Sequence, residues 1–283
     1  MTVEGDYAMA CKVMGIVNVT PDSFSDGGKY FSPEEAVRRI KNLVADGADI
    51  IDIGAESTKP GAVPLNWEDE WSRLEPVLTL LKGTVPVGGT GNWEGIPRRV
   101  KRGVAEGDAL AGVRMGTVPI SVDTYHPETA ARAIALGAKI INCVYEGTVP
   151  DMLRICAKNE AELVIPAKFL GTVPMGERGT VPVERLGTVP VYIDPMIGFG
   201  PTREEDLELL RSIPELAKRG RVLVGASRKR IVKKLTGEKM TGKNLGGNLG
   251  VSVWAAMNGA SVVRVHDVKE TVQAIKVIEA LKG

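Results

Sequence analysis

KVMGIVNVTPDSFSDGGKYFSPEEAVRRIKNLVADGADIIDIG, residues 12–54, contains a strand, a long polar loop, a helix and a second strand in that order. The runs 13–19 and 50–54 are short, apolar and β-branched, which predicts strands buried on both faces. Between them, Ser32 precedes a proline and a helical apolar pattern over 33–45, as at a capped helix N-terminus. A buried strand, a crossover helix and another buried strand form the unit of a parallel sheet.

This unit recurs along the chain, because short apolar runs continue to alternate with amphipathic stretches. The six further predicted strands are 120–124, 139–144, 162–166, 191–195, 221–226 and 262–266. The further predicted helices are 67–82, 127–136, 151–161, 203–219, 245–258 and 269–281. Eight strands with intervening helices predict an α/β fold, a closed (βα)8 TIM barrel. An open doubly wound sheet is the structural alternative.

The length of the chain fits one barrel once an insertion is set aside. At 283 residues the chain is long enough for two domains of about 150 residues or for one barrel of about 250. The stretch 87–119 separates the second predicted helix from the third predicted strand, and without its 33 residues 250 remain. We therefore expect residues 1–283 to form a single domain with an insertion at 87–119.

The tetrapeptide Gly-Thr-Val-Pro occurs six times at irregular spacing, which excludes a solenoid of fixed period. The copies are 83–86, 116–119, 147–150, 171–174, 179–182 and 187–190. Each is expected to be a connector, because glycine ends helices and proline enforces a non-helical approach to the next element. Three copies within 171–190 leave no room for a full helix, so we expect a degraded helix after the fifth strand.

Composition excludes several classes of function. The 36 basic and 35 acidic residues are well mixed, which argues against a nucleic-acid groove or a membrane-surface patch. The longest apolar runs are far below the roughly 20 residues of a membrane span, and Glu4 and Asp6 do not suit a secretory signal, so a cytoplasmic protein is expected. The three cysteines, Cys11, Cys143 and Cys156, lack CxxC spacing and are expected to be buried hydrophobic residues.

Polar residues end most of the predicted strands, and in a barrel that end carries the chemistry. Asp52 lies in the second strand, Asp123 in the third, Asn142 in the fourth and Asp194 in the sixth. Side chains of this kind, brought together, need hydrogen-bond donors, which a nitrogen-rich heterocycle would supply. A hard cation is the rival interpretation, and helix capping explains each residue singly but not all four.

The last two strands supply the positive side of the barrel mouth. Ser227-Arg228-Lys229-Arg230 follows the seventh strand, and the eighth carries Arg264 and ends at His266. Barrels often bind phosphate at these two loops, and guanidinium, ammonium and imidazole groups suit an anion. A small anionic ligand is therefore expected on this side.

Seven segments together carry a resemblance to a known family. They are MGIVNVTPDSFSDGG (14–28), IDIGAESTKPGA (51–62), ISVDTYHPETA (120–130), IINC (140–143), IDPMIGFG (193–200), VGASRKR (224–230) and VVRVHDVKET (262–271). In order and content they resemble the dihydropteroate synthases, over nearly the whole chain. The resemblance implies a TIM-barrel transferase of folate biosynthesis that joins 6-hydroxymethyl-7,8-dihydropterin diphosphate to para-aminobenzoate and releases diphosphate. It also implies a homodimer that uses Mg2+.

The resemblance also implies roles for individual residues. The pterin ring would bind among Asp123, Asn142, Asp194 and Lys229, with Phe199 and Gly225 nearby and Asp52 at the pocket floor. The diphosphate would be held by Asn18, Arg264 and His266, and Asn18 would act through the metal. The aminobenzoate site would be lined by Thr58, Pro60 and Ser227, with Lys59, Arg228 and Asp22 in loops over it. The residues expected to be catalytic are Asn18, Asp22, Lys229, Arg264 and His266.

Some positions depart from the pattern of the family. Cys143 and Met196 replace a usual Asp and Gly, and residues 165–170 stand where the family commonly has a Met-His-Met segment against the pterin. Two alternatives stay open: a pterin-dependent methyltransferase acting on a corrinoid protein, which would share the barrel and the acidic pocket, and a remodelled barrel that binds pterin without catalysis, which the altered region 164–190 suggests. The SRKR and NVTPDSFSDGG segments favour the synthase, because methyl transfer does not need them.

Overall fold

The computed structural model describes residues 11–20, 32–56, 63–82, 118–172, 185–200, 202–240 and 242–282. The strands are β1 (Lys12–Asn18), β2 (Ile50–Gly54), β3 (Ile120–Asp123), β4 (Ile140–Asn142), β5 (Glu162–Pro166), β6 (Arg185–Leu186), β7 (Val189–Asp194), β8 (Val222–Val224) and β9 (Ala260–Val265). The α-helices are α1 (Pro33–Ala45), α2 (Trp67–Lys82), α3 (Pro127–Ala135), α4 (Val149–Asn159), α5 (Phe169–Thr172), α6 (Arg203–Arg211), α7 (Ile213–Arg219), α8 (Arg230–Thr236), α9 (Leu245–Met257) and α10 (Val268–Lys282). The expected insertion at 87–119 lies outside the described residues, apart from its last two positions.

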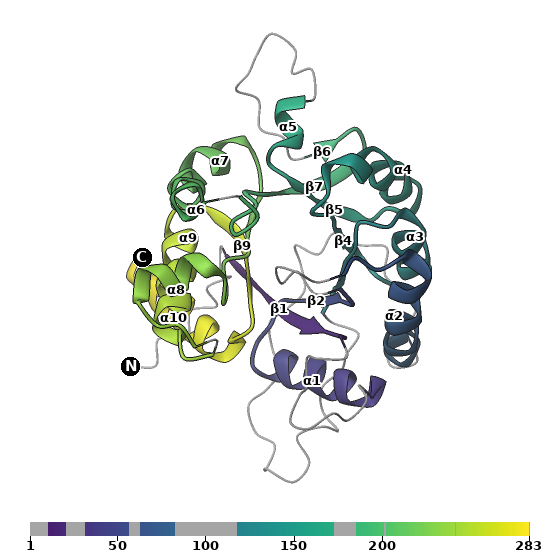
Figure 1. Ribbon diagram of the computed structural model, residues 1–283, viewed down its shortest axis with the longest axis horizontal. Coiled ribbons are helices and arrows are strands. Elements are labelled where there is room, and N and C mark those ends of the chain that lie inside the picture. Colours follow the sequence, from purple (N-terminus) through teal and green to yellow (C-terminus); the bar gives the residue numbers. More distant parts are fainter. Residues whose placement is uncertain are drawn as a thin grey trace.

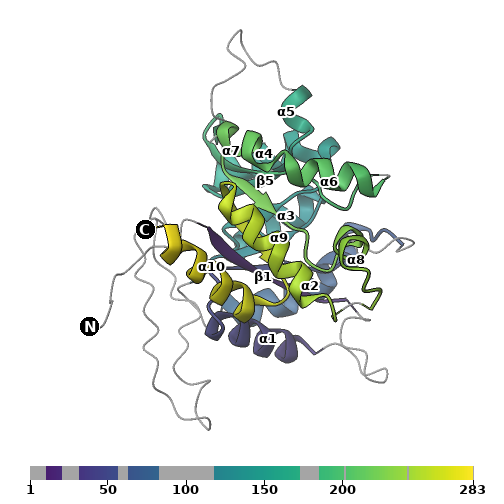
Figure 2. The ribbon, with the colours of Figure 1, turned by 90° about the vertical axis from the view of Figure 1, so that its left-hand side faces the viewer.

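Eight parallel strands close into a barrel. Their order is β5-β4-β3-β2-β1-β9-β8-β7, and the pairing of β5 with β7 completes the ring. The helices surround this ring on the outside, as the view down the barrel shows (Figure 1), and the side view shows them flanking the strands (Figure 2). The predicted (βα)8 TIM barrel is thereby confirmed, and the open sheet is excluded.

The register of the strands aligns their carboxyl ends. Asn18 is opposite Gly54, Gly54 is opposite Asp123, and Asp123 is opposite Asn142. On the other side of the ring, Asp194 pairs in the same way with the last residue of β5. Polar residues distant in sequence therefore lie at one end of the barrel, where βα loops carry function.

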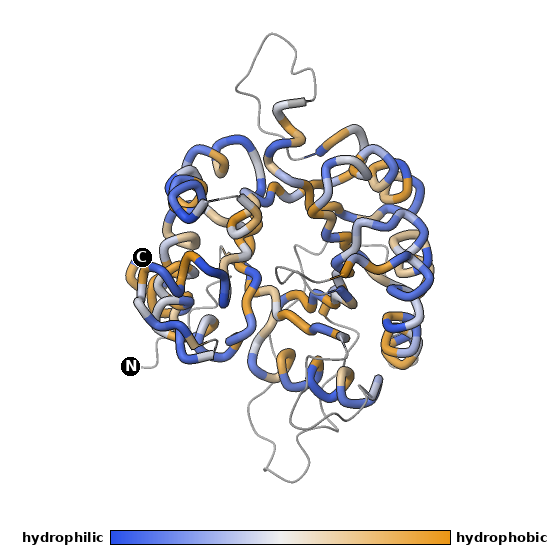
Figure 3. Tube along the Cα trace, viewed as in Figure 1, coloured by the Kyte–Doolittle hydropathy of each residue, from blue (hydrophilic) through white to orange (hydrophobic). Residues whose placement is uncertain are grey.

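Both faces of the strands are buried, which explains their nearly continuous apolar sequences (Figure 3). One face packs against the helices in a large core that includes Val13, Ile51 and Ile53. The other face fills the barrel interior with seven buried side chains: Met14, Ile50, Ile140, Val164, Tyr192, Leu223 and Val262. Successive residues of a strand point to opposite faces, so Val13 and Met14 belong to different layers.

The structure corrects the predicted single helix at 203–219. Two helices occupy this range, because α6 ends at Arg211 and α7 begins at Ile213. Pro214 lies in the first turn of α7, where its missing N–H is tolerated, whereas inside one continuous helix it would remove a hydrogen bond. The short helix α8 was not predicted.

The Gly-Thr-Val-Pro copies within the described residues do not share one conformation. The copy at 147–150 is not a connector, because Val149 and Pro150 form the first turn of α4. The copy at 187–190 turns the chain between β6 and β7, with Gly187 in the left-handed region at φ 62°. The copy at 171–174 begins within α5, and its last two residues lie outside the described residues, as does most of the segment where a degraded helix is expected.

None of the helices in the described ranges is both long enough and apolar enough to cross a bilayer.

Candidate active site at the carboxyl end of the barrel

Arg264 ties together the carboxylates that the sequence places at the strand ends. Its Nε donates to Asp52 Oδ2 at 2.6 Å, and its Nη2 donates to Asp123 Oδ2 at 2.7 Å. Asn142 Nδ2 donates to the same Asp52 oxygen at 3.3 Å. The sequence predicts that a ligand supplies hydrogen-bond donors to these carboxylates. In the structure Arg264 on β9, which is expected to bind an anion, supplies some of those donors itself.

Burial sets the ionisation of this network. It raises the pKa of the Asp123 carboxyl to about 7, and the Arg264 guanidinium opposes that rise while the Asp52 charge adds to it. For Arg264, burial alone would lower the pKa, but Asp52 and Asp123 raise it above its usual range. The arginine therefore stays charged, and Asp123 is the group that responds to pH near neutrality.

Two buried acceptor atoms in the network have no hydrogen-bond partner among the described residues. They are Asp52 Oδ1 and Asn142 Oδ1. Buried acceptors without donors cost free energy, so most are satisfied in folded proteins. Both atoms suit a ligand that brings N–H groups into the barrel mouth.

Lys229 and Asp194 form the second part of the site. The Lys229 ammonium donates to the carbonyl of Ile197 at 2.5 Å and lies 4.4 Å from the centre of the Phe199 ring. Burial lowers the pKa of Lys229 to about 8, against the opposing charge of Asp194. Burial likewise raises the pKa of Asp194, while Lys229 and the Met196 N–H, 2.7 Å from Asp194 Oδ1, hold it down.

Ser227 and His266 meet at the mouth between β8 and β9. Ser227 Oγ lies 3.1 Å from His266 Nδ1 and accepts the His266 backbone N–H at 3.3 Å. Burial lowers the pKa of His266 to about 3, and the cations Arg228 and Arg264 contribute. The imidazole is therefore neutral. When Ser227 donates to Nδ1, the imidazole carries its own proton on Nε2, which is then a hydrogen-bond donor.

The arginines of the positive side are already paired with carboxylates. Arg228 Nη2 contacts Asp267 Oδ1 at 2.8 Å, and Arg230 Nε contacts Asp206 Oδ2 at 2.9 Å. Arg264 has the two carboxylate partners described above. An anionic ligand consequently meets cations whose charge is largely compensated, although each guanidinium keeps further N–H donors.

One residue that holds the site was not predicted from the sequence. Asn248 on α9 accepts the Arg228 backbone N–H at 3.0 Å and donates to Asp267 Oδ2 at 3.2 Å. It is buried, and it supports Arg228, whose backbone is left-handed at φ 61°. The available signal was an amide side chain in the middle of a stretch, 245–257, that carries no charge.

The structure thus brings most of the predicted site residues to one end of the barrel. Asn18 ends β1, half-buried, and a side chain on Gly225 would contact Arg264. Phe199 is 43% exposed and covers Lys229. Four predicted residues, Asp22, Thr58, Lys59 and Pro60, lie outside the described residues.

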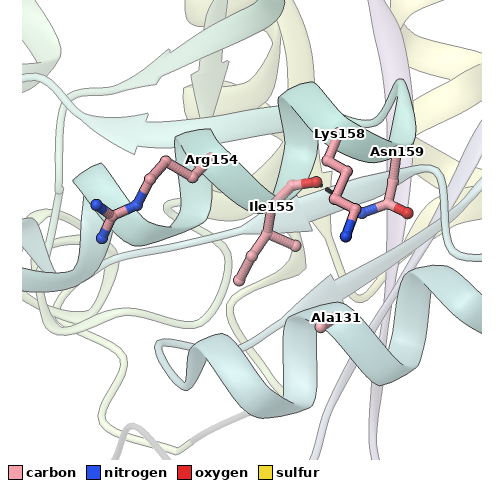
Figure 4. Close-up of a pocket in the computed structure, with 5 residues that line it drawn as sticks. All are labelled: Ala131, Arg154, Ile155, Lys158 and Asn159. Atoms are coloured by element: carbon pink, nitrogen blue, oxygen red, sulfur yellow. Dashed lines mark hydrogen bonds between the residues drawn. The ribbon is translucent and has the colours of Figure 1, made fainter.

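A separate pocket of about 400 Å3 lies on the outer surface between α3 and α4 (Figure 4). Its lining consists of Ala131, Arg154, Ile155, Lys158 and Asn159. Arg154 already pairs with the exposed Asp151, and no strand-end residue reaches this pocket. It is therefore not part of the candidate site.

The neutral His266 predicts a pH-dependent stability. Its pKa of about 3 lies below the usual 6.5, so its contribution to stability is complete above pH 6.5 and is lost as pH falls toward 3. Between pH 7.5 and pH 5 this one group should remove up to about 2 kcal/mol from the free energy of unfolding. Urea unfolding at both pH values should show a smaller loss for His266→Gln than for the parent protein. Equal losses of unfolding free energy in the two proteins would contradict the assignment of a neutral, buried His266.

Comparison with known proteins relates this arrangement to one family. A model of the family described as pterin binding enzyme matches residues 14–88 and 99–266. A dihydropteroate synthase of Streptococcus pyogenes serotype M6 is 32% identical over 297 residues, covering 99% of this chain and 97% of that protein. One from Neisseria meningitidis serogroup C is 36% identical over 278 residues, covering 95% and 92%. The solved structure of Xanthomonas albilineans dihydropteroate synthase with 4-aminobenzoic acid gives a TM-score of 0.75 at 32% identity, covering 96% of this chain and 93% of that one.

The family match also bears on the expected insertion. It leaves a break at residues 89–98, inside the stretch 87–119, and resumes at residue 99. Only part of that stretch therefore stands outside the family pattern.

Proposed function

The chain belongs to the dihydropteroate synthase family of pterin binding enzymes, and on this premise we propose how its residues carry out the reaction. It is a transferase that joins 6-hydroxymethyl-7,8-dihydropterin diphosphate to para-aminobenzoate, with loss of diphosphate. The observation that carries the assignment is the buried acid–amide network of Asp52, Asp123 and Asn142, which holds two unpartnered acceptor atoms and in which Asp123 feels the charge of Lys229.

The pterin ring binds in this network. A pterin has ring N–H and amino groups that suit the acceptors Asp52 Oδ1 and Asn142 Oδ1, and a ring carbonyl that suits the Lys229 ammonium. Asp194 is the carboxylate whose charge acts most strongly on Lys229. Phe199 and Gly225 contribute a flat apolar side chain and a narrow backbone beside the ring.

The diphosphate is held between β1 and the last two strands. Arg264 uses one N–H each on Asp52 and Asp123, which leaves three of its five donors for phosphate oxygens. His266 donates from Nε2 as a neutral group, and Asn18 offers an amide oxygen at the end of β1.

Mg2+ fits this donor chemistry. It prefers oxygen ligands and usually binds through one or two protein groups together with substrate phosphates, so Asn18 would hold it. No cluster of three or more carboxylate, histidine or cysteine side chains suited to a metal occurs within the described part of the chain. Arg228, Arg230 and Arg264 already pair with carboxylates. Mg2+ would supply neutralisation of the charge that develops on the departing diphosphate.

The diphosphate leaves before the new carbon–nitrogen bond forms. As the bond from the pterin methylene carbon to the diphosphate oxygen loosens, its electrons go to the diphosphate, and positive charge develops on the pterin. The carboxylates Asp52 and Asp194 stabilise that charge from positions fixed by the fold. The neutral amine of para-aminobenzoate then attacks the methylene carbon and loses a proton, which completes dihydropteroate.

The aminobenzoate site includes Ser227, which the hydrogen bond to His266 fixes. We assign Thr58 and Pro60 to the same site, and Asp22, Lys59 and Arg228 to the loops beside it.

We also propose that the chain forms a single cytoplasmic domain and assembles as a homodimer. Support for the homodimer comes from α9 and α10, which pack against each other. Helix α9 carries no charged residue, and Trp254 and Met257 on it are exposed, as are Val277 and Leu281 on α10. Burying such side chains against a second copy would stabilise a dimer.

The direct test is the reaction itself. The purified, folded protein should release diphosphate and form dihydropteroate when given both substrates and Mg2+, measured by a coupled diphosphate assay and by chromatography of the product. Pterin diphosphate alone should bind in calorimetry. Binding without turnover would favour the remodelled, non-catalytic barrel, and a protein that neither binds nor turns over would contradict the proposal.

A further inference from the structure

The loop after β7, residues 196–200, lies directly against the side chain of Lys229. The Ile197 carbonyl accepts from the Lys229 ammonium, and the Phe199 ring lies over it. A Cβ atom on Gly198 would come within 2.6 Å of Lys229 Cδ. The position of this loop therefore decides the position of the Lys229 ammonium.

The backbone of the loop adopts a conformation that needs external support. Met196 and Gly198 have φ values of 67° and 87°, in the left-handed region. For a methionine this conformation is strained, and such strain persists only where the surroundings hold it. One support is Asp194, which accepts the Met196 N–H.

Asp206 supplies the other support from α6. Its carboxylate is completely buried, Oδ1 accepts the Gly198 N–H at 2.7 Å, and Oδ2 accepts from Arg230 Nε at 2.9 Å. Arg230 in turn donates to the carbonyl of Gly200, and to that of Thr202 at 3.0 Å. The buried Asp206 and the partly exposed Arg230 thus bind three backbone groups: the Gly198 N–H and the carbonyls of Gly200 and Thr202.

Burying the Asp206 carboxylate costs free energy. A buried carboxylate is tolerated only when a cation and hydrogen bonds compensate its desolvation. Its bonds go to the loop backbone and to Arg230, and none of them goes to Lys229 or Phe199. Its hydrogen bonds therefore reach the pocket only through the loop, whereas its charge also acts through space and helps to raise the pKa of Lys229.

We propose that Asp206, held by Arg230, is a positioning residue for pterin binding, which fixes residues 196–200 so that Lys229 and Phe199 meet the ring. The identity of the ligand rests on the proposed function, whereas the hold on the loop does not.

The kinetic test compares Asp206→Ala with Asp206→Asn. Asp206→Ala should raise the KM for pterin diphosphate about tenfold or more, because displacement of binding groups by about 1 Å has effects of this order, and should leave the KM for para-aminobenzoate unchanged. Asp206→Asn keeps an acceptor for the Gly198 N–H and should recover most of the loss. An equal rise in both KM values, or no rise in either, would overturn the inference.

Two control variants separate positioning from general stability. Glu204→Ala breaks an exposed ion pair with Lys234 that also joins α6 to α8 but has no contact with the loop. Leu210→Ala removes a buried side chain from α6 and should destabilise the fold. Neither should change the ratio of the two KM values, and a change equal to that of Asp206→Ala would overturn the inference.

A second measurement needs no substrate. Hydrogen exchange of the Gly198 amide, followed by NMR in the ligand-free protein, should become faster in Asp206→Ala than in the parent protein. The double variant Asp206→Leu/Arg230→Met replaces the ion pair with apolar side chains, which proteins often tolerate, and serves the same test if the single variant does not fold. Unchanged exchange of the Gly198 amide would overturn the inference that Asp206 fixes the loop.

The outcomes distinguish this inference from the proposed function. A parent protein that binds no pterin diphosphate overturns the proposed function and with it the ligand named here. Normal binding by the parent and equally tight binding by Asp206→Ala overturn only the inference.

Discussion

Lys229→Ala is expected to weaken the binding of pterin diphosphate by roughly 10- to 100-fold, because it removes a hydrogen bond from a charged donor worth about 1.5–3 kcal/mol. The ammonium is held in place by the Ile197 carbonyl and the Phe199 ring. Its charge also holds down the pKa of Asp194, so its removal should raise that pKa further and favour the protonated acid. Both effects act against the ligand.

Calorimetric titration with pterin diphosphate measures this loss. Lys229→Met keeps the aliphatic part of the side chain and should lose nearly as much affinity, which would assign the effect to the charge. Lys239→Ala, at an exposed position just beyond α8, changes the net charge equally and should bind normally. Unchanged affinity in Lys229→Ala would remove that residue from the pterin site.

The barrel could be predicted from the sequence because strands that are buried on both faces have short, mostly apolar sequences that are easy to recognise. Strands β1, β2 and β5 read as continuous apolar runs, and the predicted bounds agree with the observed ones within one residue. The break between α6 and α7 was missed, although Pro214 was a visible signal for it. Helix α8 was missed because its seven residues, four of them basic or polar, show too little periodicity.

The site could be predicted as a set of residues but not as a set of partners. The position of Asp52, Asp123 and Arg264 near strand ends is a property of the sequence. One arginine can bind both carboxylates only because the barrel closes, which places β9 beside β1 and on the same ring as β2 and β3. Asp206 illustrates the same limit, because in the sequence it follows Glu204 and Glu205 as one more acid at a helix start, and only the fold buries it.

Arg264→Met should cost about 3–5 kcal/mol in the free energy of unfolding, because removing one partner of a buried ion pair leaves the other charge uncompensated. The Asp52 side chain is completely buried and Arg264 is 17% exposed, so water can replace little of the lost interaction. Asp52 would keep only the longer hydrogen bond from Asn142. Urea unfolding at pH 7 measures the loss.

The origin of this loss can be separated from simple loss of packing. Without the guanidinium the pKa of Asp123, already raised by burial to about 7, should rise further, so the deficit of the variant should shrink as pH falls and the carboxyl takes up a proton. Arg264→Met/Asp52→Asn should regain part of the stability, because one buried charge is gone. Arg211→Met breaks an exposed pair with Glu208 and should change stability by less than about 1 kcal/mol. A deficit for Arg264→Met that is equally small would mean that the carboxylates do not depend on this arginine, and the electrostatic account of the pterin pocket would then be wrong.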